Sequence, residues 1–203
     1  MIKALIFDAG GVVFNSSVSL FQKPIEYISD LVSESMEKVD KAYRGAIVEC
    51  ESRTVSKQEI WEAVMRRLGK DVPYSAQDPI EFGFKSFKLD EGVVSLVKKL
   101  RSNYKVALVS NANAVEASTP QAQSMYKFFD VVDLSYKIGV RKPSPGIYEN
   151  AFKKLGAKPS EIVFVDNAPE NVEEARKLGM VGILFKNTKQ LKEDLEKVGV
   201  KVQ

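Results

Sequence analysis

The chain has 203 residues, of which 44% are hydrophobic and 28% charged, a composition typical of a soluble globular domain and too apolar for a disordered one. Thirty basic residues against 27 acidic ones give a net charge of +3, and no basic run is longer than a pair, so a dedicated nucleic-acid surface is not indicated. The absence of histidine and the presence of a single cysteine, Cys50, exclude histidine-based triads, histidine-ligated zinc and an intramolecular disulfide.

The N-terminal segment MIKALIFDAGG has an apolar run that Lys3 and Asp8 interrupt. This run is too short and too charged for a signal peptide or a membrane span. We therefore expect a cytoplasmic protein that binds neither membrane nor nucleic acid. The sequence does not indicate an oligomeric state.

Short β-branched or apolar runs alternate with helical patterns along the chain. The runs occupy residues 2–7, 106–109, 131–134, 162–165 and 181–185. Continuous apolar runs of this length are typical of strands buried on both faces of a parallel sheet. Apolar stripes with helical spacing follow at residues 93–100, 147–155, 172–178 and 191–198. The alternation predicts an α/β fold with a Rossmann-like, doubly wound parallel sheet.

A long segment separates the first predicted strand from the second, and helical spacing dominates it. One stripe runs from Ile25 to Met36; another follows Ser56, where Glu59 would complete a capping box, and ends at Gly69. We therefore assign residues 1–14 and 86–203 to the core, and residues 15–85 to an inserted all-helical cap. An insertion at this point should stand over the carboxyl edge of the sheet, where ligands bind in open α/β folds.

Polar residues stand where the predicted strands end or a helix begins. They are Asp8, Ser110, Asn111, Lys142 and Asp166. Two carboxylates at neighbouring strand ends suit Mg²⁺, and a hydroxyl with adjacent N–H groups can hold phosphate oxygens. Each residue also has an ordinary interpretation. Asp8, Ser110, Asn111 and Asp166 could simply be turn or helix-capping residues. Lys142 could be a solvated surface lysine.

The order and spacing of these residues resemble the four motifs of the haloacid dehalogenase (HAD) superfamily. The similarity covers nearly the whole chain and is strongest in IFDAGGVVF, ALVSNA, GVRKPSPGIYENAF and EIVFVDNAPENVEEARKLGM. The resemblance implies a hydrolase with a C1-type cap, similar to HAD phosphatases of the glucose-1-phosphate type. Its expected reaction is Mg²⁺-dependent hydrolysis of a small phosphorylated metabolite through an aspartyl-phosphate intermediate.

The resemblance implies a role for each matching position. Asp8 corresponds to the nucleophile, and Lys142 to the lysine that orients it and neutralises charge. The implied substrate-binding residues are Ser110, Asn111 and Lys142, and the implied Mg²⁺ ligands are Asp8, the backbone carbonyl of Gly10 and Asp166. Phosphoryl transfer depends mostly on positioning and charge stabilisation, which these groups supply without histidine.

Gly10 departs from the usual pattern, in which this position carries an aspartate that acts as general acid and base. We therefore expect slow turnover, most of all with poor leaving groups. Two alternatives stay open. One is a 2-haloacid dehalogenase, which needs no metal, and the other is a catalytically weak protein that binds a phosphorylated ligand. The retained acidic residue Asp166 favours the phosphatase over the dehalogenase.

Overall fold

A five-stranded parallel sheet forms the centre of the computed structural model, which describes residues 1–15, 21–74 and 88–202. The strands are β1 (Ala4–Phe7), β2 (Lys105–Ser110), β3 (Val131–Leu134), β4 (Ile162–Asp166) and β5 (Val181–Leu184). Their order is β3-β2-β1-β4-β5, so β1 lies in the middle and pairs with both β2 and β4. The predicted α/β class and all five predicted strands are confirmed, with small differences at their ends. β1 begins at Ala4 and not at residue 2, β2 is one residue longer at each end, β4 extends to Asp166, and β5 ends at Leu184.

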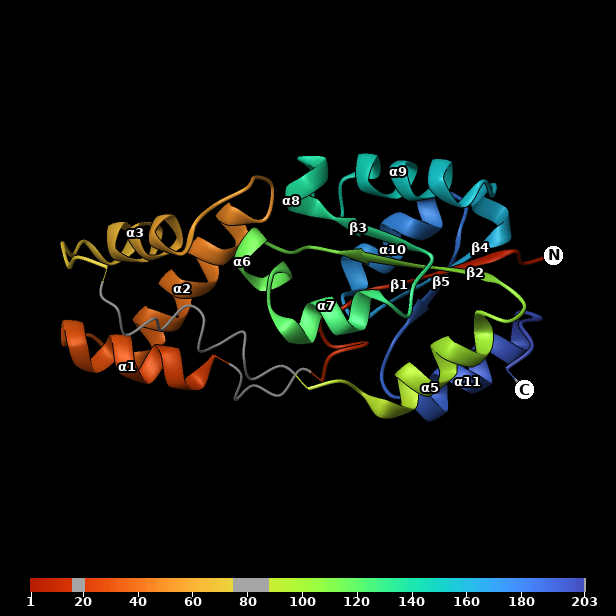
Figure 1. The fold of residues 1–203 in the computed structure, drawn as a ribbon, viewed down its shortest axis with the longest axis horizontal. Coiled ribbons are helices and arrows are strands. Elements are labelled where there is room, and N and C mark those ends of the chain that lie inside the picture. The colour runs from red at the N-terminus through yellow and green to blue at the C-terminus, as the bar shows by residue number, and fades with distance from the viewer. Residues whose placement is uncertain (16–20, 75–87, 203) are drawn as a thin grey trace.

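Helices cover both faces of this sheet (Figure 1). Leu5 and Phe7 point to one face, where they pack in one apolar cluster with α5 (Glu91–Leu100) and α11 (Thr188–Lys197). Ala4 and Ile6 point to the other face, where they pack in a second cluster with α9 (Pro145–Leu155) and α10 (Pro169–Lys177). Burial on both faces explains why the strands read as continuous apolar runs.

Short helical segments complete the core. They are α6 (Ala114–Ala117), α7 (Pro120–Tyr126), α8 (Ser135–Ile138) and the 3₁₀ turn η2 (Pro159–Glu161). Of these, α6 matters most for the site, because it follows the carboxyl end of β2 and lies beside the separate group of helices in Figure 1. No helix within the described ranges is both long enough and apolar enough to cross a bilayer.

That separate group comprises α1 (Gln22–Val32), α2 (Met36–Cys50) and α3 (Lys57–Leu68), which surround an apolar cluster of their own. Tyr43 and Trp61 are buried in this cluster. The capping box of Ser56 with Glu59 is present, and Gly69 ends α3 in the left-handed conformation, as the sequence predicts.

The prediction of one apolar stripe from Ile25 to Met36 is wrong. Ser33 adopts a left-handed conformation with φ 53° and ends α1, and Ser35 then caps a new helix that begins at Met36. Leu31 and Met36 are exposed, at 44% and 45%. The apolar spacing therefore continues across a break that a cap and a turn impose on the backbone.

Two backbone segments connect α1–α3 to the core, and they run antiparallel to each other. Phe14 forms a bridge with Leu89, and the Asn15 N–H donates to the Lys88 carbonyl at 2.9 Å. The predicted boundary near residue 85 lies outside the described residues. The assignment of residues 15–85 to a cap therefore stays a prediction.

Candidate active site

Asp8 and Asp166 lie side by side at the carboxyl edge of the sheet. Asp8 follows β1 and Asp166 is the last residue of β4; the Asp8 N–H donates to the Val165 carbonyl at 2.9 Å. Both residues are buried, with 7% and 0% of their surface exposed. The pairing of the two strands therefore brings both carboxylates to one place.

The Lys142 side chain joins these carboxylates. Its Nζ lies 2.5 Å from Asp8 Oδ1 and 2.7 Å from Asp166 Oδ2. Only 1% of Lys142 is exposed, which excludes the interpretation as a solvated surface lysine. Buried charges are tolerated when they are paired and hydrogen-bonded, and this ammonium group has two carboxylate partners.

Asn111 fixes the backbone of Lys142. Its Oδ1 accepts from the Lys142 N–H at 2.7 Å, and its Nδ2 donates to the Lys142 carbonyl at 3.0 Å. Both polar atoms of the amide are thus engaged with the loop that carries the lysine. These two bonds position Lys142, and the role of Asn111 in substrate binding stays a prediction. The neighbouring Ser110 hydroxyl makes only a long contact of 3.4 Å to the Asn111 carbonyl.

Asp166 is held by further hydrogen bonds. Its Oδ1 accepts from the Ala168 N–H at 2.8 Å, and its Oδ2 accepts from Asn171 Nδ2 at 3.0 Å in addition to Lys142. Asn171 stands in the first turn of α10, and its carbonyl accepts from the Tyr148 hydroxyl at 3.2 Å. The carboxylate at the end of β4 is therefore fixed from α10, from the residue before α10 and from the loop that carries Lys142.

Burial and mutual charge shift the pKa values of this cluster. Burial raises the pKa of Asp8 to about 6 against the opposing effect of Lys142, and the negative charge of Asp166 adds to the rise. Burial also lowers the pKa of Lys142, but Asp8 and Asp166 outweigh this effect and hold the pKa above its ordinary value. With both carboxylates ionised, the three groups carry one excess negative charge, which favours binding of a further cation.

The oxygen atoms at this edge fit Mg²⁺. This ion takes oxygen ligands, and proteins usually hold it through one or two carboxylates while it keeps several waters. Asp8 and Asp166 provide two carboxylates, and the Gly10 carbonyl belongs to the turn that follows β1. No group of three or more acidic or cysteine side chains forms a metal cage in the part of the chain that the structure describes, so such an ion would keep part of its hydration.

The two glycines after Ala9 differ in their surroundings. Gly11 has φ 80°, and a Cβ built on it would lie 2.3 Å from Asn167 Nδ2. Gly10 does not have a positive φ, and a Cβ there would meet nothing within 4 Å. The backbone therefore requires glycine at position 11 but has room for a side chain at position 10.

Sequence reasoning missed two glutamates near Asp8. Glu51 follows α2 and is 8% exposed; its Oε2 accepts from Arg141 Nε at 2.8 Å, which joins the α1–α3 group to the loop of Lys142. Glu116 lies on α6 beside Val115, a member of the apolar cluster of α1–α3. No catalytic motif marks either glutamate, because the proximity of Glu51 to Lys142 and of Glu116 to Asp8 depends on how α1–α3 pack against the core.

Comparisons with known proteins agree with this architecture. The family model of haloacid dehalogenase-like hydrolases matches residues 2–179. The D-ribitol-5-phosphate phosphatase of Bacteroides thetaiotaomicron is 27% identical over 187 residues, which cover 88% of this chain and 89% of the relative. The glyceraldehyde 3-phosphate phosphatase of Methanopyrus kandleri is 26% identical over 200 residues, which cover 93% and 86% of the two chains.

A solved structure shares the fold. The crystal structure of a HAD family enzyme from Bacteroides thetaiotaomicron, in complex with magnesium and inorganic phosphate, aligns with a TM-score of 0.72 at 24% identity. The alignment covers 92% of this chain and 95% of that one.

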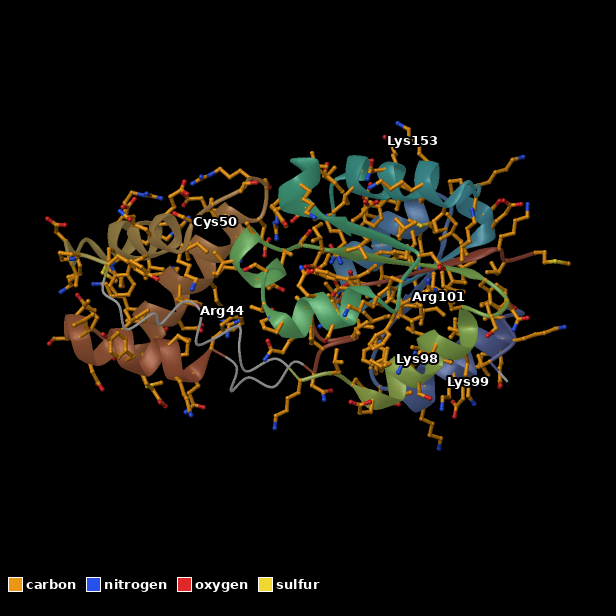
Figure 2. The ribbon with its side chains drawn as sticks, in the orientation of Figure 1. Arg44, Cys50, Lys98, Lys99, Arg101 and Lys153 are labelled. Atoms are coloured by element: carbon orange, nitrogen blue, oxygen red, sulfur yellow. The ribbon has the colours of Figure 1, made fainter. Side chains whose placement is uncertain are left out.

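Replacing Lys142 by methionine should leave two buried carboxylates without their cation. Removing one partner of a buried ion pair costs about 3–5 kcal/mol, and we expect a loss of this size in the free energy of unfolding at neutral pH, measured by urea denaturation. The loss should shrink as the pH falls through about 6, where the Asp8 carboxylate is protonated. The control is Lys153→Met, which changes an exposed lysine of α9 (Figure 2). Equal losses in both variants would contradict the buried pairing.

Alanine substitutions at Gly10 and Gly11 should have different effects on the free energy of unfolding. Gly11→Ala should lower the free energy of unfolding by at least about 1–2 kcal/mol, because it forces a side chain into the left-handed region and against Asn167. Gly10→Ala should be nearly neutral in the same urea titration. A stable Gly11→Ala protein would show that the turn after β1 rearranges easily.

Proposed function

Because this chain belongs to the haloacid dehalogenase-like hydrolase family, we propose that it is a Mg²⁺-dependent phosphatase of small phosphomonoesters. The buried contact of Lys142 with both Asp8 and Asp166 is the observation that carries the proposal. It combines a carboxylate nucleophile, a fixed positive charge and a second carboxylate suited to a hard cation. Two relatives named as phosphatases, at 27% and 26% identity over most of the chain, support the substrate class.

In the proposed reaction, an Asp8 oxygen attacks phosphorus. The bond from phosphorus to the leaving-group oxygen breaks, and an aspartyl-phosphate forms. Water then attacks this intermediate, releases inorganic phosphate and restores the Asp8 carboxylate. Lys142 keeps the nucleophile oriented and offsets charge on the phosphoryl oxygens, and the hydroxyl of Ser110, the last residue of β2, donates to one of them.

Three groups of this chain would hold the metal: the carboxylates of Asp8 and Asp166 and the backbone carbonyl of Gly10. When bound there, Mg²⁺ supplies positive charge that offsets the negative charge of the phosphoryl group. Asn171 and the Ala168 N–H keep Asp166 oriented for this role.

The names of the relatives point to a substrate of few carbon atoms. One relative is named for D-ribitol 5-phosphate and the other for glyceraldehyde 3-phosphate. We infer a sugar or polyol phosphate of similar size for this chain. The α1–α3 group, whose residue Glu51 contacts Arg141 beside Lys142, would form the side of the site that selects the substrate.

Asp8→Asn should abolish hydrolysis of p-nitrophenyl phosphate, because it keeps the shape of the side chain and removes its nucleophilic charge. The activity of the unchanged chain should require Mg²⁺ and disappear in EDTA. The measurement is release of p-nitrophenolate with and without added metal. Full activity in EDTA, or release of halide from a 2-haloacid, would favour the dehalogenase alternative.

Asp166→Asn should weaken metal affinity more than the chemical step. The Mg²⁺ concentration for half-maximal activity should rise, and excess Mg²⁺ should recover part of the lost rate. A metal titration of both proteins checks this. If no concentration of Mg²⁺ restores any rate, the proposed ligand role is wrong.

A further inference from the structure

Gly10 leaves the proposed reaction without a proton donor at the usual position. An alkoxide leaving group needs a proton as its bond to phosphorus breaks, and general acid catalysis typically contributes about 10²–10⁴ in rate. The chain contains no histidine to supply this proton. An efficient reaction with ordinary esters therefore needs another proton donor near Asp8.

Most ionisable groups around Asp8 are already engaged. Lys142 is held between two carboxylates, and Asp166 accepts hydrogen bonds from three residues. Glu51 is paired with Arg141. Glu116 differs from them, because its carboxyl group has no ion pair or hydrogen bond with any residue that the structure describes.

Two other glutamates of this chain show the hydrogen bond that a glutamate at the third position of a helix normally accepts. Each stands three residues after a helix N-cap and accepts from the N-cap N–H: Glu59 from Ser56 at 2.8 Å, and Glu161 from Lys158 at 3.0 Å. The Ser56 N–H holds the pKa of Glu59 at about 2. Lys3, followed by the Lys158 N–H, also lowers the pKa of Glu161.

Glu116 occupies the same helical position but does not make this contact. The N-cap residue Asn113 accepts from the Val115 and Glu116 N–H groups through its side chain, while the Glu116 carboxyl does not return to the cap. The side chain is only partly exposed. Its carboxyl group therefore takes no part in capping α6.

That carboxyl group lies near the nucleophile. The negative charges of Glu51 and Asp8 act on Glu116, and Glu116 in turn acts on Tyr126 of α7. α6 begins four residues after Ser110, and its Val115 packs against α1–α3. Glu116 thus stands where the core meets α1–α3, close to both Asp8 and the end of α2.

We propose that Glu116 is the general acid of this chain, in place of the side chain that Gly10 lacks. This inference rests on the proposed phosphatase function. Glu116 donates its proton to the leaving-group oxygen, directly or through one water, as that oxygen separates from phosphorus. The resulting carboxylate then accepts a proton from the water that hydrolyses the aspartyl-phosphate, so the acid is restored in each turnover.

The protonation state of Glu116 suits this role. Burial raises its pKa to about 8, and the charges of Glu51 and Asp8 add to the rise. Its charged or titratable neighbours are Glu51 just after α2, Asp8 just after β1 and Tyr126 of α7. The nearby cations Arg141 and Lys142 are paired with other carboxylates. Glu116 therefore carries a proton at neutral pH and loses it as the pH rises through about 8.

The test compares two esters with Glu116→Gln, which keeps the shape of the protonated acid but cannot donate its proton. With glycerol 2-phosphate, kcat/KM should fall about 10²-fold or more; with p-nitrophenyl phosphate, whose leaving group needs little protonation, it should change only a few-fold. The matched control is Glu149→Gln on an exposed position of α9, which should change neither rate.

The pH profile gives a second readout that does not depend on a variant. With glycerol 2-phosphate, kcat/KM of the unchanged chain should fall as the pH rises through about 8, and with p-nitrophenyl phosphate this fall should be much weaker. In Glu116→Gln, kcat/KM should depend on pH in the same way for both esters. A profile that is the same for both esters would overturn the proposal.

Restoring the usual aspartate should compensate for the loss of Glu116. Because position 10 has room for a side chain, Gly10→Asp in the Glu116→Gln background should recover activity with glycerol 2-phosphate, whereas Gly10→Asn should not. If both substitutions at position 10 restore activity, or if neither does, the Glu116→Gln variant is not slow because it lacks a proton donor.

Stability tests the protonated state of Glu116 separately from activity. A raised pKa means that the folded chain binds this proton more tightly than the unfolded chain, so stability decreases as the pH rises from about 5 to about 8. The melting temperature of Glu116→Gln relative to the unchanged chain should therefore increase over this range. A constant difference would show that Glu116 titrates normally and overturn the inference.

The two proposals fail in different ways. If the unchanged chain with Mg²⁺ hydrolyses neither ester, the phosphatase function is wrong and the role of Glu116 falls with it. If p-nitrophenyl phosphate is hydrolysed in an Asp8-dependent manner while Glu116→Gln has equal effects on both esters, only the role of Glu116 is wrong.

Discussion

Burying the Lys142 ammonium group requires carboxylates within hydrogen-bond reach, and the order β2-β1-β4 supplies them from adjacent strand ends. The requirement extends outward. Asn111 at the end of β2 holds the lysine backbone, and Asn171 of α10 holds Asp166. The positions of Asp8 and Asp166, the proposed nucleophile and metal ligand, thus depend on the ion pairs that each forms with the buried Lys142 ammonium group.

The sheet could be predicted from the sequence because both of its faces are buried. Neighbouring residues such as Leu5 and Ile6 pack on opposite faces, so consecutive positions of β1 are all apolar. The end of α1 could not be predicted in this way. Met36 continues the apolar spacing, and the left-handed residue at the break is Ser33 rather than the glycine that usually signals a helix end.

The candidate site was only partly predictable. Asp8, Lys142 and Asp166 could be identified from their order along the chain, but the burial of Lys142 depends on the packing of neighbouring elements. Glu116 was hidden for a different reason. Asn113 followed three residues later by glutamate has the pattern of a capping box, and the same pattern correctly describes Ser56 with Glu59. The hydrogen bond from the N-cap N–H, which Glu59 accepts and Glu116 does not, distinguishes the two glutamates.

The bridge between Phe14 and Leu89 brings the chain back to the core beside the point where it left. The entropic cost of a loop whose ends meet grows only slowly with its length. The intervening sequence can therefore lengthen, shorten or diversify during evolution while β1 and β2 keep their register. The substrate selection that we propose for α1–α3 can thus diverge separately from the chemistry that we propose for the core, because different stretches of one gene encode them.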